Sequence, residues 1–168
     1  VAFHQVADAG VVTYTRFVRK GFVAVYGDES EFQIGKGVVL HESPEDAATI
    51  ITSGLMVDEA LKAYEQLQAE GISVRGVDMF TWKPLDEELV VKCARETGAI
   101  VTAENHNVTC GLGSVVANCL ARTCPTVQEF VGVQDAFGQV GPLDFLMDEY
   151  GLRAANIVAA VKKAVARK

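Results

Sequence analysis

The sequence predicts an α/β fold in which helices cover both faces of a mostly parallel sheet. Short runs rich in β-branched residues alternate along the chain with stretches whose apolar residues recur every three or four positions. In addition, 49% of the 168 residues are hydrophobic and only four are proline, which is enough apolar surface for a folded core. Parallel strands need long crossovers, and the helices between the strands provide them.

Residues 49–77 contain the clearest strand-helix-strand pattern. Residues 49–53 are β-rich, residues 57–67 carry apolar side chains at helical spacing, and residues 72–77 are again β-rich. Gly71 stands where a left-handed stop is expected at the end of the helix. The pattern therefore predicts two neighbouring strands joined by a helix that covers the sheet.

The alternation continues to the C-terminus. The expected elements are, in order, a helix opened by Pro84 and Asp86, a strand over 99–103, a helix over 112–120, a strand over 129–133, and helices over 143–150 and 157–165. Leu146, Met147 and Tyr150 are expected to face the sheet. Residues 11–18 are also β-rich, but they precede the alternating region and are expected to belong to a separate piece of structure.

Composition and charge argue against several classes of protein. The formal net charge is −7, so the chain repels phosphate backbones, and we expect no nucleic-acid partner. The basic cluster at residues 162–168 is expected to oppose the dipole of the last helix. No apolar run approaches the roughly 20 residues of a membrane span, and the first residues do not resemble a signal peptide. We therefore expect a cytoplasmic protein without a membrane partner.

Four cysteines, at positions 93, 110, 119 and 124, match no zinc-binding or redox spacing. Cys93 and Cys119 lie on apolar helical stripes and are expected in the core. Cys110 and Cys124 lie near Gly or Pro and are expected to be partly exposed. Reduced thiols are the favoured interpretation, and a disulfide or redox role is the alternative.

Residues 110–114, Cys-Gly-Leu-Gly-Ser, open a predicted helix. Free N–H groups at a helix start, together with the helix dipole, hold phosphates and carboxylates, which makes Gly111, Gly113 and Ser114 candidates for an anion site. A dinucleotide fingerprint would need a third glycine at position 116, where this chain has Val116. The alternative is that the glycines allow close packing of the helix against its neighbours or form an interface.

Glu104 and His106 follow a predicted strand directly, at the carboxyl end where open α/β sheets place ligands. A carboxylate and an imidazole two residues apart are able to do acid–base work. No further ligand stands at a metal-binding spacing, since His4 and His41 lie far away in sequence, so we expect no metal site. A hydrogen-bonded loop or an interface is the alternative role. Ser114 lacks the Gly-x-Ser-x-Gly frame of a nucleophile elbow, and no catalytic residue is assigned.

Arg16 and Arg19 lie three residues apart in the β-rich stretch near the N-terminus. Their planar guanidinium groups have the donor geometry that grips a phosphate. Solvated arginines at the end of a strand are the alternative interpretation. From the residues alone, the chain is therefore expected to be an α/β domain without a self-contained active site.

Several stretches resemble the C-terminal part of transketolase, in the same order and at similar spacing. They are residues 32–37 (Phe-Gln-Ile-Gly-Lys-Gly), 49–55 with Glu59-Ala60-Leu61, 80–86 (Phe-Thr-Trp-Lys-Pro-Leu-Asp), 101–106 (Val-Thr-Ala-Glu-Asn-His), 111–114 (Gly-Leu-Gly-Ser) and 137–152. The resemblance covers about residues 11–168. The block at 80–86 is shared loosely with deoxyxylulose phosphate synthase and the beta subunit of pyruvate dehydrogenase, two related thiamine diphosphate enzymes, which are the alternative members.

The resemblance implies a three-layer α/β/α fold with a mostly parallel five-stranded sheet and one antiparallel edge strand. Residues 35–168 would form the transketolase C-terminal domain, and residues 1–30 the tail of the preceding pyrimidine-binding domain plus linker. The Arg-x-x-Arg of residues 16–19 resembles the family's phosphate-binding stretch, which would make Arg19 a ligand of the substrate phosphate. Arg153 stands where relatives often carry a capping Thr or Ser, so the last helix is expected to start weakly, at a cost of ~1 kcal/mol.

The resemblance further implies a transferase of carbohydrate metabolism, in the pentose phosphate pathway, that moves ketol groups between sugar phosphates as a homodimer. In the family, thiamine diphosphate and magnesium bind outside the C-terminal domain, so this chain alone is expected to bind neither and to be inactive. Its partners would be the remaining transketolase domains or an N-terminal subunit, and its role would be to support the dimer. The alternative function is a free-standing regulatory module that binds a small anionic metabolite in the crevice between Glu104 and Ser114.

Overall fold

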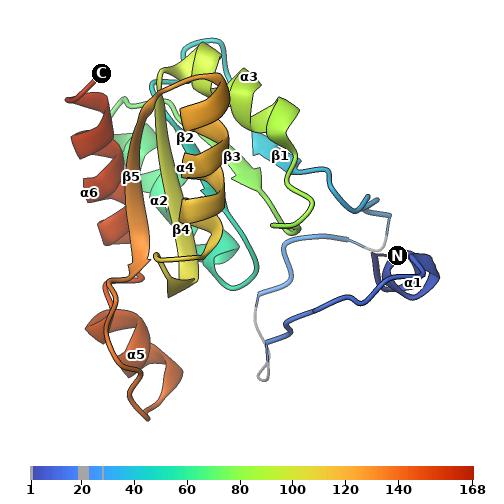
Figure 1. Cartoon of the computed structure of the whole chain (residues 1–168). Helices are drawn as coiled ribbons and strands as arrows, with labels where there is room; N and C mark the ends of the chain where they lie inside the picture. Colours follow the sequence, from blue (N-terminus) through green and yellow to red (C-terminus); the bar gives the residue numbers. More distant parts are fainter. Residues whose placement is uncertain (1, 19–22, 28) are drawn as a thin grey trace.

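The computed structural model describes residues 2–18, 23–27 and 29–168. Within these residues, five strands form one sheet of order β1-β3-β2-β4-β5 (Figure 1). They are β1 (Val38–His41), β2 (Thr49–Thr52), β3 (Arg75–Asp78), β4 (Ala99–Asn107) and β5 (Val127–Val133). β1 pairs antiparallel with β3, whereas β2 is parallel to β3 and β4, and β4 is parallel to β5. The predicted mostly parallel sheet with one antiparallel edge strand is confirmed.

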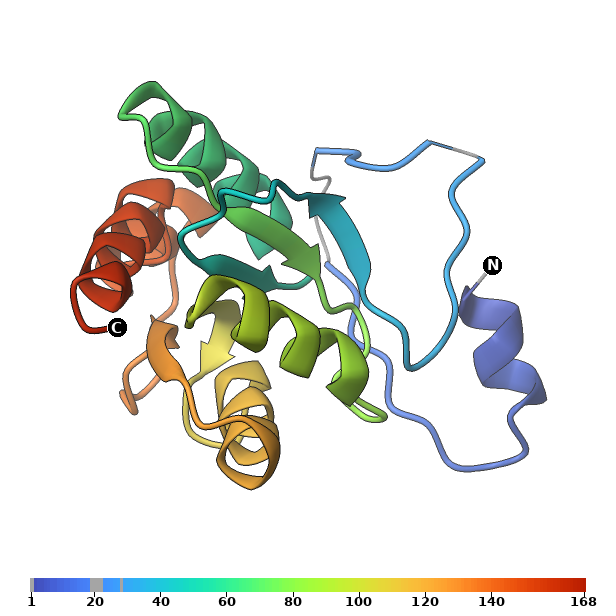
Figure 2. The same cartoon turned by 90° about the horizontal axis from the view of Figure 1, so that it is seen from above.

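Helices cover both faces of the sheet, which gives the molecule three layers (Figure 2). α2 (Met56–Ala69) and α6 (Ala154–Val165) pack on one face, and α3 (Glu87–Thr97) and α4 (Leu112–Thr123) pack on the other. Two shorter helices, α1 (Ala2–Asp8) and α5 (Leu143–Glu149), lie outside the two helical layers (Figure 1).

The central strands are apolar on both faces, because both faces are covered. In β2, Ile50 belongs to the core under α2 and α6, and Ile51 to the core under α3 and α4. In β4, Val101 and Ile100 divide between the two cores in the same way. All four side chains are fully buried, and each contributes about 1.5 to 3 kcal/mol of burial free energy.

The start of α6 differs from the expectation. Arg153 is the N-cap residue, and its side chain does not cap the helix. The carboxylate of Glu59, from α2, instead accepts a hydrogen bond from the Ala154 N–H at 2.7 Å. Arg153 binds Asp148 at 2.6 Å between Nε and Oδ1. A carboxylate 95 positions away in sequence thus supplies the acceptor that the N-cap side chain does not.

α5 lies beyond the carboxyl ends of the strands rather than on a face of the sheet (Figure 1). Met147 is buried in the core with α2 and α6, and Tyr150 packs at the margin of that core. Leu146 is only partly buried. The expected packing of these side chains against the sheet is therefore right for Met147 and wrong for Leu146, because the connection from β5 carries the short helix past the end of the sheet.

The described residues before position 35, which we call the N-terminal segment, place α1 away from the sheet, and the chain after α1 runs back toward it (Figures 1 and 2). Residues 11–18 are extended but form no strand within the described part of the chain. Their side chains include Val12, Tyr14 and Phe17, which are 103%, 89% and 71% exposed. The β-rich pattern of this stretch therefore predicts its extended backbone but not a pairing partner.

The basic residues at the C-terminus do more than oppose the helix dipole. Lys162 pairs with Glu70 of α2 at 2.5 Å. Lys163 and Arg167 both pair with Glu129 of β5, Lys163 at 2.7 Å. These cations therefore fasten α6 to the neighbouring helix and strand.

Candidate functional site

The carboxyl ends of β2, β3 and β4 form one edge of the sheet, which we call the carboxyl edge. Glu104, in β4, lies there and is 1% exposed. Its Oε2 accepts a hydrogen bond from the Leu112 N–H at 2.7 Å, and its Oε1 accepts one from the Gly113 N–H at 2.8 Å. Burial raises the pKa of Glu104, and the two backbone hydrogen bonds lower it in part. The chain's own carboxylate thus takes the donors that the sequence predicts for an anion.

Gly111 and Gly113 let this carboxylate reach the start of α4. A Cβ on Gly111 would overlap the Glu104 carboxylate. A Cβ on Gly113 would lie 2.5 Å from the Phe130 ring and 2.8 Å from the Thr102 hydroxyl. The geometry therefore favours close packing as the reason for these glycines, rather than binding of an external anion.

His106 and Ser114 make local hydrogen bonds at the same edge. His106 Nδ1 lies 2.8 Å from the Asn107 carbonyl oxygen but 3.9 Å from Glu104 Oε2. Ser114 donates to the Val108 carbonyl at 2.7 Å. Glu104 and His106 therefore come close without forming the hydrogen bond that an acid–base pair needs, and the hydrogen-bonded loop is the interpretation that the geometry favours.

Trp82 is a residue of this edge that the sequence analysis did not select as a site residue. Its Nε1 donates to Ser53 Oγ, at the end of β2, at 3.0 Å. Its ring meets the His106 ring edge to face, with 5.6 Å between the centroids. The loop after β3 is thereby tied to the ends of β2 and β4.

Two side chains of the N-terminal segment reach the carboxyl edge. Arg16 Nη2 donates to the backbone carbonyl of Asn105 at 2.9 Å and to its Oδ1 at 2.6 Å. Tyr26 donates its hydroxyl proton to Asp78 Oδ2 at 2.8 Å. Arg19, the predicted phosphate ligand, lies outside the described residues. The structure therefore brings Arg16 to the edge that holds Glu104 and His106 and gives no position for Arg19.

Asp78, the last residue of β3, is a buried acid that the sequence analysis missed. It is 4% exposed, and its Oδ1 has no hydrogen-bond partner among the residues that the structure describes. Burial raises the pKa of Asp78 to about 6, although the hydrogen bond from Tyr26 lowers it in part. Burial and the charge of Asp78 raise the pKa of Tyr26 well above its ordinary value. The signal that could have pointed to Asp78 is its position in the sequence, directly after the predicted strand over residues 72–77.

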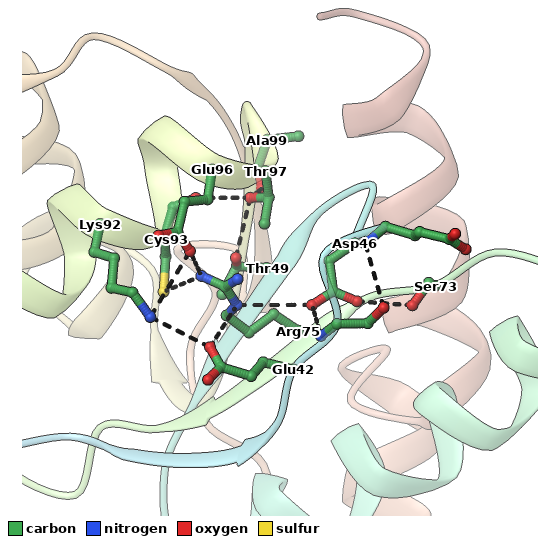
Figure 3. A network of polar contacts seen from close by, with 12 residues as sticks. Glu42, Asp46, Thr49, Ser73, Arg75, Lys92, Cys93, Glu96, Thr97 and Ala99 are labelled. Atoms are coloured by element: carbon green, nitrogen blue, oxygen red, sulfur yellow. Dashed lines mark hydrogen bonds and ion pairs between the residues drawn. The ribbon is translucent and has the colours of Figure 1, made fainter.

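The opposite end of β3 buries a cation within a cluster of acids (Figure 3). Arg75 is 4% exposed, and its Nη1 donates to Glu96 Oε2 at 2.5 Å. Its Nε lies 3.6 Å from Glu42 Oε2 and 3.7 Å from Asp46 Oδ2. Cys93 Sγ completes the surroundings at 3.8 Å from Nη1. Every one of these partners belongs to residues 35–168, so we regard the cluster as structural.

Other candidate features give no site in the part of the chain that the structure describes. No three His, Cys, Asp or Glu side chains among the described residues gather closely enough to hold a metal ion. None of the described helices has the length and apolar character needed to span a membrane. Cys93 and Cys119 are buried, Cys110 is exposed and Cys124 is partly exposed, as the sequence predicts. All four thiols are free in the structure.

Comparisons with known proteins agree with the fold and with the sequence resemblance. The family described as Transketolase, C-terminal domain matches residues 35–157. The chain is 42% identical over 167 residues to the 6-deoxy-6-sulfo-D-fructose transketolase subunit SqwH of Clostridium sp. (strain MSTE9), covering 99% of this chain and 51% of that protein. It is 37% identical over 151 residues to a putative transketolase C-terminal section of Methanocaldococcus jannaschii, covering 88% and 46%.

A solved structure described as a split gene transketolase, inactive beta4 tetramer, superposes with a TM-score of 0.83. It is 47% identical in sequence, and the match covers 88% of this chain and 48% of that chain. The chain thus spans about half the length of these relatives. The family match extends over most of the chain, from three residues before β1 into α6, and this chain belongs to the transketolase family through its C-terminal domain.

Proposed function

We propose that this chain is the C-terminal part of a transketolase that transfers ketol groups between sugar phosphates. The observation that carries the proposal is the 42% identity with a transketolase subunit over 99% of the chain. Because the chain spans 51% of that relative, we assign the reaction to a complete enzyme to which this chain contributes a part.

Within that enzyme we assign residues 35–168 the role of supporting the dimer and the preceding domain, and residues 1–30 to the tail of that domain. The contacts of Arg16 and Tyr26 with the carboxyl edge support this assignment, because they link the two parts. We assign Arg19 as the ligand of the substrate phosphate, since a guanidinium group binds phosphate through paired donors. No catalytic residue is assigned to this chain.

We place the cofactors, thiamine diphosphate and magnesium, in the remaining domains or in an N-terminal subunit. These domains or this subunit are also the partners of this chain, in an enzyme that we propose to be a homodimer. Magnesium prefers hard oxygen ligands, and the described residues contain no group of three acidic, His or Cys side chains to which the ion fits. The four free thiols support a reducing, cytoplasmic location.

The regulatory module is the less favoured function. Its proposed crevice contains the N–H groups of Leu112 and Gly113, and both already donate to Glu104. A small anion would have to displace a buried carboxylate that lies on the same chain. A thermal-shift screen of the chain with phosphate, sulfate and small carboxylates separates the two functions, because a sensor is stabilised by one of these anions and a supporting domain by none.

Calorimetry and an activity assay test the proposal directly. The isolated chain should show no saturable heat with thiamine diphosphate and Mg²⁺. In a coupled assay with xylulose 5-phosphate and ribose 5-phosphate it should read as background, and activity should appear only with the complete enzyme. Micromolar cofactor binding by the isolated chain would refute the proposed function. A complete enzyme that acts on pyruvate alone, or on pyruvate together with glyceraldehyde 3-phosphate, would also refute it.

A further inference from the structure

The exposed large apolar side chains of residues 35–168 are unevenly distributed. Val39 and Phe130 are isolated in sequence and are 37% and 38% exposed. The others lie close together, in the connection from β5 to α5 and in α5 itself, and we call them the α5 patch: Phe137, Val140, Leu143 and Phe145. Scattered single apolar side chains are ordinary on a protein surface, whereas neighbouring ones with a polar rim mark a surface that another molecule covers.

The fold displays two side chains of the α5 patch on a fixed loop. Phe137 and Val140 are 99% and 102% exposed. The Tyr150 hydroxyl donates to the Phe137 carbonyl at 3.0 Å and accepts from the Gln139 N–H at 2.8 Å. Tyr150 packs at the margin of the core, and Gln139 Nε2 donates to Glu149 Oε1 at 2.9 Å. The loop is therefore tied to the end of α5, and the folded backbone itself holds Phe137 and Val140 in solvent.

The polar surroundings of the α5 patch are acidic. Residues 134–153 contain four acids and one arginine, which gives a formal charge of −3. The four acids are exposed, and they are Asp135, Asp144, Asp148 and Glu149. The arginine, Arg153, pairs with Asp144 at 3.2 Å and with Asp148 at 2.6 Å. A complementary surface therefore has apolar groups at its centre and lysine or arginine at its rim.

This charge argues against a second copy of the patch as the occupant. A twofold axis would place the acidic rim of one copy against the same rim of the other, and like charges oppose that contact. α5 lies beyond the carboxyl ends of the strands, the edge at which Arg16 and Tyr26 are bound (Figure 1). Both belong to the segment that we assign to the preceding domain, so we expect that domain on the same side of the sheet as the α5 patch.

We propose that the α5 patch docks onto the part of the enzyme outside this chain, on a surface that is apolar at its centre and basic at its rim. This inference rests on the proposed function, in which a complete enzyme contains that part. Phe137 is the expected anchor, because buried aromatic side chains near the centre of an interface contribute most to its affinity.

Thiol labelling at the patch tests the docking. The thiol of Phe137→Cys should react with iodoacetamide about tenfold more slowly in the complete enzyme than in the isolated chain, because a covered site reacts only when the contact opens. Peptide mass identifies the labelled position, so the native thiols do not interfere. Val140→Cys should show the same protection with the Phe137 ring intact.

Glu88→Cys is the matched control. The Glu88 side chain is 90% exposed on α3, away from the patch, and a thiol there should react at the same rate in both samples. Equal rates in both samples at positions 137 and 140 as well would show that the patch stays exposed and would overturn the proposal. Protection that already exists in the isolated chain and is lost on dilution would show that a second copy is the occupant, and would overturn the assigned one.

Charge reversal at the rim tests the chemistry of the partner surface. Asp144→Lys, made in the Val140→Cys chain, should reduce the protection of position 140 about threefold at low salt and less at high salt, because rim charges attract through a screened field. Glu88→Lys, the same reversal on α3, should leave the protection unchanged. Unchanged or greater protection after Asp144→Lys would show that the partner rim is not basic.

Activity separates this inference from the proposed function. If the complete enzyme transfers ketol groups from xylulose 5-phosphate to ribose 5-phosphate while positions 137 and 140 stay reactive, the proposed function stands and the docking is wrong. If both positions are protected in a complete enzyme without this activity, the docking stands and the proposed reaction is wrong.

Discussion

The two ends of β3 bury opposite charges and satisfy them in different ways. Arg75 begins the strand and Asp78 ends it, and each is 4% exposed. Three carboxylates from residues 35–168 surround Arg75 within 3.7 Å. Within the described part of the chain, one Asp78 oxygen accepts a hydrogen bond from Tyr26 of the N-terminal segment, and the other oxygen has no partner.

The difference shows which edge of the sheet is complete within the domain. At the opposite edge, formed by the amino ends of the same strands and called the amino edge, Arg75 Nε also lacks a hydrogen-bond partner among the described residues. The carboxylates around this cation nevertheless belong to residues 35–168, so its counter-charges come from the same folded unit. At the carboxyl edge, Asp78 and Asn105 both take partners from the N-terminal segment. A charge left with one partner in a dry environment is costly, so the carboxyl edge is expected to depend on residues before position 35.

The largest expected effect is at the amino edge, where removing the cation leaves its acids behind. Arg75→Met should lower the free energy of unfolding by about 3 to 5 kcal/mol, because Asp46 stays buried without its cation. Chemical denaturation of the isolated chain at pH 7 measures this loss.

Lys92→Met provides the control for that loss. Lys92 contacts the same Glu42 and Glu96 as Arg75, at 3.3 and 3.8 Å, but its side chain is 49% exposed. Its removal should change the free energy of unfolding by less than about 1 kcal/mol. Equal losses in the two variants would show that burial of the cation does not set the stability of the amino edge.

The second largest expected effect concerns Glu104, whose carboxylate at the carboxyl edge accepts hydrogen bonds from residues of the same domain. Glu104→Ala leaves the N–H groups of Leu112 and Gly113 buried without acceptors, and it should destabilise the chain by about 2 to 4 kcal/mol. Thermal or denaturant unfolding measures it. Glu88→Ala removes a glutamate of the first turn of α3 whose side chain is 90% exposed, and it should cost less than about 0.5 kcal/mol. A Glu104→Ala chain as stable as the Glu88→Ala chain would contradict the internal role of Glu104.

Much of the fold is predictable from the sequence because its signals are local. Alternating β-rich and helical stretches, with Asp86 as a cap and Gly98 as a left-handed stop, place α3 between two strands. The antiparallel direction of β1 has no such signal, because nothing in the four residues Val38–His41 indicates whether the strand pairs parallel or antiparallel. That feature was predicted only through the resemblance to transketolase.

The residues selected as a candidate site lie together in the structure, but the hydrogen bonds among them could not be predicted from the sequence. Glu104 and the glycines at 111 and 113 were expected to share a crevice that holds an external anion, whereas in the structure the Glu104 carboxylate itself accepts from the start of α4. The pairs Arg16 with Asn105 and Tyr26 with Asp78 span 89 and 52 positions. Only the path of the N-terminal segment brings them together, and no local pattern encodes that path.

The smallest expected effect is a change with pH at the carboxyl edge. Burial raises the pKa of Asp78 to about 6, above the ~3.9 of an unfolded aspartate. The folded chain therefore binds the proton more tightly than the unfolded chain. This contribution to stability is fully present below pH ~4 and is lost as the pH rises through about 6, by about 2 to 3 kcal/mol in total.

Asp78→Asn should remove that dependence while keeping an acceptor for Tyr26. The variant should be about 2 kcal/mol more stable than the native chain at pH 8, and the difference between the two should shrink toward pH 4. Denaturant unfolding at pH 4, 5, 6, 7 and 8 measures this difference. Tyr26→Phe should act in the opposite sense, because losing its hydrogen bond raises the pKa of Asp78 further and extends the loss to higher pH. Asp144→Asn, which changes an acid whose side chain is 88% exposed, should follow the native profile. If Asp78→Asn also follows the native profile, burial of the Asp78 charge costs the fold nothing, and the expected difference between the two ends of β3 disappears.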